Sequence, residues 1–290
     1  MNTINICFNQ EPSAIYTLWK AFRSRNSRYV PSKEYLIIHA SRREFPIDMK
    51  HLNDFHSICG VVRLAQLHML YPFTLVYPYI MRVLCNEEIP VSMFKTLNTR
   101  NSIIMHRPIM PDERLEIDCR NSQPRITAKG IEIDVHSFVQ SRDEKVWENT
   151  TTYFYPGKFG PSGESSCTHK IEPLKDGAAI DQWHLQAKDR FRFARISGDT
   201  NGIHYWYYYA RMMGFERDFA QPIRIVTRCV SSIPDIEWTR PVRLDFYLKG
   251  PVYYDSTLTL KNAVANCKNR FDLFCSGNDK PVISGILYNV

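Results

Sequence analysis

Two pairs of short stretches recur at nearly the same distance along the chain. FHSICG at 55–60 resembles FARISG at 193–198, which lies 138 residues further on. HRPIMPDERLEI at 106–117 resembles KGPVYYDSTLTL at 249–260, which lies 143 residues further on. A recurrence at a constant offset is typical of a duplicated structural unit. We therefore expect the 290 residues to form two copies of one unit.

Each copy combines a helix-like segment with strand-like segments. The apolar helical segment at 64–84 belongs to the first copy, and that of the second starts within 205–215. Alternating stretches such as GIEIDVHSFVQ and NRFDLFCSG predict strands. The Gly-, Pro- and Ser-rich stretch at 156–176 predicts a linker, between an N-terminal domain at 1–155 and a C-terminal domain at 177–290. The predicted fold class is α+β, with two tandem helix-plus-antiparallel-sheet repeats.

Composition narrows the class of protein. Hydrophobic residues make up 44% of the chain and charged residues 23%, a globular balance. No apolar run reaches the roughly 20 residues that a membrane helix needs, and the N-terminus lacks the pattern of a signal peptide. The eight cysteines form no CxxC, which favours reduced thiols. We therefore expect a cytoplasmic protein with no membrane span.

The net charge of +7 is compatible with an anionic partner, although solvated basic faces give such an excess equally well. Nucleic acid is not expected, because the chain has no zinc-finger or RRM signature. Arg224 and Arg228 are candidate contacts for the phosphate of a ligand. His51 and His56 are spaced i, i+5, so they do not share one helical face, and we expect no metal site.

The stretch ISGDTNGIHYW at 196–206 carries the residues best suited to chemistry. Asp199 and His204 converge only if the backbone turns between them, and the intervening Asn and Gly are turn residues. An ionised carboxylate and a neutral imidazole in one pocket hold a water together and move its protons. The alternative from residue types alone is an ordinary loop, in which Asp199 caps a helix. The tyrosine-rich run that follows His204 is expected to pack in the core or line a tunnel.

FARISGDTNGIH at 193–204 resembles the signature of the MaoC-like (R)-specific enoyl-thioester hydratases and 3-hydroxyacyl-thioester dehydratases, and the flanking segments resemble two-repeat members of this family. The resemblance implies a double hotdog fold, in which the two repeats pack as a pseudo-dimer. It implies that Asp199 and His204 are the catalytic pair, which activates water for addition to a 2-enoyl thioester. Ser197, Gly198 and Asn201 would support the loop.

The repeat also indicates which half is catalytic. Val61 and Gln66 stand where Asp199 and His204 stand in the second copy. The first half therefore has no acid–base pair at this place, and we expect a catalytically degenerate N-terminal hotdog. The resemblance further implies an acyl thioester of coenzyme A or of an acyl carrier protein as substrate, with no cofactor. The expected assembly is a monomer or a homodimer.

The sequence departs from the family pattern at the oxyanion region. The family has a His-Gly pair whose glycine N–H stabilises the enolate, whereas Gln221 and Pro222 stand there in this chain. Because proline has no N–H, either another donor serves, such as Gln221, or activity is impaired. The alternatives left open are a thioesterase and a non-catalytic acyl-thioester scaffold, the second favoured by Pro222.

Overall fold

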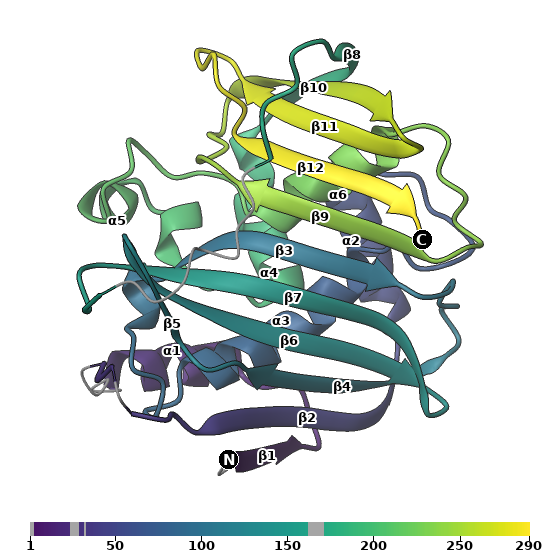
Figure 1. The fold of residues 1–290 in the computed structure, drawn as a ribbon. Coiled ribbons are helices and arrows are strands. Elements are labelled where there is room, and N and C mark those ends of the chain that lie inside the picture. The colour runs from purple at the N-terminus through teal and green to yellow at the C-terminus, as the bar shows by residue number, and fades with distance from the viewer. Residues whose placement is uncertain (1–2, 24–28, 32, 162–170) are drawn as a thin grey trace.

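A computed structural model describes residues 3–23, 29–31, 33–161 and 171–290 (Figure 1). The strands of this part of the chain are β1 (Thr3–Phe8), β2 (Ile37–Pro46), β3 (Leu97–Met105), β4 (Arg114–Asn121), β5 (Arg125–Thr127), β6 (Gly130–Ser141), β7 (Glu144–Pro156), β8 (Ala178–Leu185), β9 (Val242–Leu248), β10 (Ser256–Ala265), β11 (Lys268–Cys275) and β12 (Ile283–Asn289). The helices are α1 (Ala14–Arg23), α2 (Met49–Cys59), α3 (Tyr71–Leu84), α4 (Arg190–Ser197), α5 (Tyr207–Met212) and α6 (Pro222–Ser232), with 3-10 turns η1 (Met93–Lys95), η2 (Ala187–Asp189) and η3 (Gly202–His204).

All of these strands form one sheet, whose order is the same on either side of a central seam. One side runs β2-β4-β6-β7-β3 and the other runs β8-β10-β11-β12-β9. At the seam β3 and β9 pair antiparallel, with Ile103 opposite Leu244, and both side chains are fully buried. β1 adds to the edge beside β2, while β8 is the opposite edge. Apart from β1 and from β5, which pairs with β6, the sheet therefore consists of two copies of a five-strand unit, which Figure 1 shows below and above the seam.

The repeated sequence stretches fall at equivalent places in the two copies. The stretches FHSICG and FARISG lie at the ends of α2 and α4. Their last residues, Gly60 and Gly198, cap these helices, and both glycines have a left-handed φ of 67°. Such a conformation is readily adopted by glycine. Pro108 lies between β3 and β4, and Pro251 lies between β9 and β10. The predicted duplication is confirmed, and the fold is α+β as expected.

The domain boundaries stay a prediction. β7 ends at Pro156 and β8 begins at Ala178. Of the expected linker, residues 162–170 lie outside the described residues. Within the described ranges, every helix is too short or too polar to cross a bilayer.

The helices pack on one face of the sheet, behind it in Figure 1. In the first copy α3 fills the place predicted for the segment at 64–84, beginning at Tyr71 and ending at Leu84. In the second copy the prediction is wrong. The segment at 205–215 forms only the short α5, where Tyr208 is 74% exposed. The buried helix is α6, in which the apolar residues Ile223, Val226 and Val230 recur at helical spacing and are buried.

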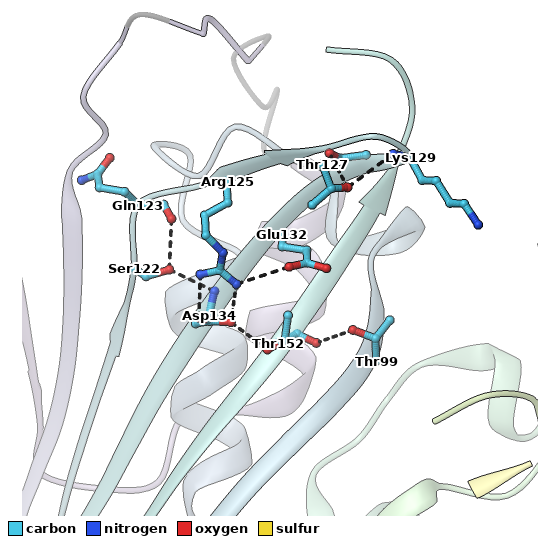
Figure 2. A network of polar contacts seen from close by, with 10 residues as sticks. Thr99, Ser122, Gln123, Arg125, Thr127, Lys129, Glu132, Asp134 and Thr152 are labelled. Atoms are coloured by element: carbon cyan, nitrogen blue, oxygen red, sulfur yellow. Dashed lines mark hydrogen bonds and ion pairs between the residues drawn. The ribbon is translucent and has the colours of Figure 1, made fainter. Parts of the chain in front are cut away.

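A polar network ties four strands of the first copy together near one end of the sheet (Figure 2). The Arg125 guanidinium on β5 donates to both carboxylate oxygens of Asp134 on β6, at 2.6 and 3.1 Å. Asp134 also accepts from the Thr152 hydroxyl on β7 at 2.7 Å, and Thr99 on β3 donates to the Thr152 carbonyl at 3.2 Å. Burial raises the pKa of Asp134, but the hydrogen bonds from Arg125 and Thr152 outweigh it and hold this pKa below its ordinary value.

This network predicts a pH-dependent loss of stability. Arg125→Gln is expected to lower the free energy of unfolding at pH 7 by about 1.5–3 kcal/mol, the contribution of a hydrogen bond to a charged group. A depressed carboxyl pKa contributes stability above the unfolded pKa and loses it as the pH falls through the folded pKa. The difference between wild type and variant should therefore shrink below about pH 4. Urea unfolding at pH 7 and at about pH 2, well below the unfolded pKa, measures it, and an equal difference at both pH values would contradict the assignment.

Candidate active site

The segment between α4 and η3 folds by side chain-to-backbone hydrogen bonds. Gly198 takes the left-handed conformation that ends α4, and the Asp199 N–H donates to the Ser197 hydroxyl at 3.3 Å. The Asp199 carboxylate accepts from the Asn201 N–H at 3.0 Å, and the Asn201 side chain accepts from the Ile203 N–H at 3.3 Å. Two successive Asx turns therefore reverse the chain within this short segment, as its turn residues predicted.

The reversal brings Asp199 and His204 together. The His204 Nε2 lies 3.4 Å from Asp199 Oδ2, and the two residues are only 6% and 7% exposed. The His204 Nδ1 lies 2.9 Å from the Phe219 carbonyl oxygen. Because a carbonyl only accepts, Nδ1 carries the hydrogen, and in the neutral ring Nε2 is the free acceptor. Two acceptors, one carboxylate and one imidazole nitrogen, thus face the same point.

This pair lines a cavity of about 320 Å³ to which both copies of the fold contribute. The second copy supplies Ser197, Asp199, Asn201 and His204, together with the start of α6. The first copy supplies α3, β7 and the beginning of β3. Much of the wall is apolar, with side chains that include Phe73, Met93, Phe193, Phe215, Phe219 and Leu248. Such a lining suits an apolar ligand with one reactive polar group.

Two tyrosines of the first copy reach Asp199, and no pattern in the sequence marked them as site residues. Tyr77 on α3 hydrogen-bonds the Asp199 carboxylate, and Tyr153 on β7 lies beside it. Burial and the neighbouring carboxylate of Asp199 raise the pKa of both phenols. Both therefore stay protonated, and the Tyr77 hydroxyl acts as a donor to Asp199. Within the described residues, the buried Tyr153 hydroxyl has no hydrogen-bond partner.

Tyr77→Phe tests this contact. Loss of a hydrogen bond to a charged group, about 1.5–3 kcal/mol, is expected to lower kcat/KM by about 10- to 100-fold if the bond orients Asp199 for reaction. Because Phe keeps the ring, the melting temperature should change little. Tyr79→Phe on the same helix, whose hydroxyl is buried outside this cavity, is the matched control. An equal loss of activity in the two variants would show that Tyr77 acts through packing alone.

Gln221 and Pro222 line the same cavity. Pro222 is the first residue of α6, and Gln221 precedes it as the N-cap residue without a side-chain capping bond. The Gln221 Oε1 accepts from the Tyr254 hydroxyl at 3.4 Å. Among the described residues, the Gln221 Nε2 has no partner although the side chain is only 2% exposed. The pairing of Oε1 leaves the amide N–H groups as buried donors without an acceptor.

The expected phosphate contacts lie elsewhere. Arg224 and Arg228 line a second cavity, of about 230 Å³, and neither lines the one that holds Asp199 and His204. The remaining site residues of the second copy, from Ser197 to Pro222, surround the first cavity or the turn beside it.

The predicted packing of the tyrosine-rich run in the core or a tunnel is wrong, because Trp206, Tyr207 and Tyr208 are exposed. Within the described part of the chain, no group of three or more His, Cys, Asp or Glu residues could hold a metal ion.

Comparisons with known proteins place this geometry in context. No protein-family model matches the chain. The chain is 24% identical over 217 residues to 3-hydroxyacyl-thioester dehydratase X of Mycobacterium tuberculosis, covering 75% of this chain and 77% of the relative. The solved structure of HtdX, also of Mycobacterium tuberculosis, superposes with a TM-score of 0.74 at 20% identity, covering 87% of this chain and all of that one.

Two further solved structures share the architecture. A MaoC-like dehydratase from Phytophthora capsici matches with a TM-score of 0.70 at 14% identity, over 89% of this chain and 96% of that one. The chain has the double hotdog fold of the MaoC-like dehydratases. A Mycobacterium tuberculosis protein described as a double hotdog also matches, with a TM-score of 0.55 at 11% identity, over 84% of this chain and 92% of that one. In this double hotdog the site lies where the two repeats meet, and the resemblance seen in the sequence is confirmed.

Proposed function

We propose that the chain is a hydratase or dehydratase that interconverts 2-enoyl thioesters and (R)-3-hydroxyacyl thioesters. The observation that carries the proposal is the convergence of Asp199 Oδ2 and His204 Nε2 at 3.4 Å in a largely apolar cavity. Similarity to a 3-hydroxyacyl-thioester dehydratase supports the substrate class. The thioester carrier is coenzyme A or an acyl carrier protein.

The proposed reaction uses both acceptors on one water. In hydration the water donates its hydrogens to Asp199 and His204, and its oxygen attacks C3 of the enoyl group as one acceptor removes a proton. The electron pair of the C2–C3 double bond moves toward the thioester carbonyl, and C2 then receives the proton that the acceptor took from water, which restores the starting state of the pair. Dehydration is the reverse, with a proton removed from C2 and the C3 hydroxyl leaving as water. The ring orientation that the Phe219 carbonyl fixes keeps Nε2 toward the reacting atoms.

The thioester oxygen needs a donor while it carries negative charge. Pro222 offers no N–H, so we propose the Gln221 side-chain amide in its place. The support is the buried Nε2 without a partner, held by the bond between Oε1 and Tyr254. With the Gln221 amide as donor, the enzyme is active although Pro222 departs from the family pattern.

We propose that this is the one catalytic site of the chain. At the equivalent place in the first copy, the Gln66 Nε2 donates to the Trp238 carbonyl at 3.3 Å. His68, close by, bonds Ser231 at 3.1 Å, and burial lowers its pKa to about 3. A histidine that stays neutral and a paired amide offer no acid–base couple there. The N-terminal hotdog then serves as the wall that carries Tyr77 and Tyr153.

A spectroscopic assay with a short 2-enoyl-CoA tests the function. Loss of the absorbance of the conjugated thioester without release of free thiol is the expected result. Release of free thiol would identify a thioesterase instead. Binding of the thioester with neither change would favour the non-catalytic scaffold, the alternative to which the missing N–H of Pro222 points.

A further inference from the structure

The second cavity lies apart from the catalytic cavity. It is lined by the end of α2, the end of β8 with the turn that follows, and one face of α6. Its volume is about 230 Å³. Among the described residues, the two cavities share no lining side chain. Nothing proposed above for Asp199 and His204 uses it.

Cationic side chains dominate this second cavity. Lys188, Arg224 and Arg228 line it, against one carboxylate, Asp189. Lys188 is exposed and makes no ion pair with any described residue. The hydroxyl-bearing Ser57 also lines it. The lining therefore presents an excess of positive charge and hydrogen-bond donors.

Arg224 is the most informative of these residues. It is only 7% exposed, and its Nη1 has no hydrogen-bond partner among the described residues. Its ion pair with Asp189 spans 3.5 Å, whereas Asp189 lies closer, at 3.1 Å, to Arg192. A buried guanidinium with a free donor is costly unless an acceptor satisfies it. The shared carboxylate supplies that acceptor only in part.

Arg228 is held in place beside Arg224. Its guanidinium bonds Asp181 at 3.1 and 3.4 Å and lies over the Trp183 ring, 4.4 Å from the centroid. This cation is thus pre-organised before any ligand binds.

We propose that this second cavity is a binding site for a phosphate group. The unpartnered Nη1 of Arg224, the Arg228 guanidinium held by Asp181 and the Lys188 ammonium, brought from α6 and the turn after β8, offer donors to an anion with several oxygens. Two sources share this chemistry: the phosphates of a thioester carrier, and a separate phosphorylated ligand. The site does not depend on the proposed hydratase activity, because its occupancy is measured without a thioester.

Calorimetric titration of the full chain with inorganic phosphate, at constant ionic strength, tests the site. The expected result is saturable binding that weakens about tenfold or more in Arg224→Gln, where a charged hydrogen bond is lost. Lys188→Gln, at an exposed position, should weaken binding by a smaller factor. Lys280→Gln, exposed in the turn after β11 and outside the lining of the cavity, carries the same change in charge and should bind as wild type does.

Folding and ligand source are checked in the same series. Circular dichroism and the melting temperature without phosphate show whether Arg224→Gln is folded, and Lys188→Gln keeps the test valid if it is not.

Competition between coenzyme A and phosphate would identify the carrier as the source, while simultaneous binding of both would identify a separate ligand. No saturable binding to wild type, or equal binding by wild type, Lys188→Gln and Lys280→Gln, would overturn the proposal.

Discussion

Asp199→Asn is expected to lower kcat for hydration by about 10²–10⁴-fold, the usual contribution of a positioned acid or base. The amide keeps the size of the side chain and one acceptor oxygen, but its NH₂ group opposes the hydrogen bond from water. His204→Ala should cause a loss of similar size, because both groups act on one water and neither replaces the other. The double variant should then be little worse than either single variant. Stopped-flow absorbance of an enoyl thioester measures all three.

The control for these variants is the equivalent position in the first copy. Gln66→Ala removes a hydrogen bond to the Trp238 carbonyl but no member of the proposed pair, so its activity should stay within a small factor of wild type. Melting temperatures separate loss of chemistry from loss of fold. A Gln66 variant as inactive as His204→Ala, at equal stability, would contradict the assignment of a single site.

The sequence predicted those features that depend on local chemistry. The chain reversal between Asp199 and His204 is specified by a few neighbouring residues, and it forms as two Asx turns. The repeated stretches, which recur at offsets of 138 and 143 residues, were sufficient to predict the duplication. The Asp199–His204 contact follows from the same turn residues, since no distant segment is needed to bring the two together.

Features that depend on packing between distant segments of the chain could not be predicted from the sequence. Tyr77 meets Asp199 only because α3 of the first copy packs beside α4 of the second. Tyr77 lies in a segment with the sequence pattern of an ordinary apolar helix, so the sequence did not indicate a contact with Asp199. The aromatic residues of α5 indicated a buried helix by composition, but the sheet is already covered by α6. Likewise the sequence named Arg224 and Arg228 as candidate phosphate contacts but could not show that they line a second cavity rather than the one that holds Asp199 and His204.

The second large effect is expected at the oxyanion position. Gln221→Ala should lower kcat by about 10²–10³-fold, as removal of a single oxyanion donor does. The loss should appear in kcat more than in KM, because the charge on the thioester oxygen develops only in the transition state. Tyr254→Phe removes the 3.4 Å hydrogen bond to the Gln221 Oε1. It should lower kcat by a smaller factor, because the amide remains but its orientation is no longer held.

Pro222→Gly should act in the opposite direction. It introduces a backbone N–H at the first residue of α6, beside the proposed thioester oxygen, and is expected to raise kcat by up to about 10–100-fold. Pro222→Ala restores the same N–H without the flexibility of glycine, so a gain in both variants assigns the effect to the donor. The gain should be largest in the Gln221→Ala background, where the competing donor is gone. If wild type is fully active and none of these substitutions changes its rate, the oxyanion is held by other groups and Gln221 has no catalytic role.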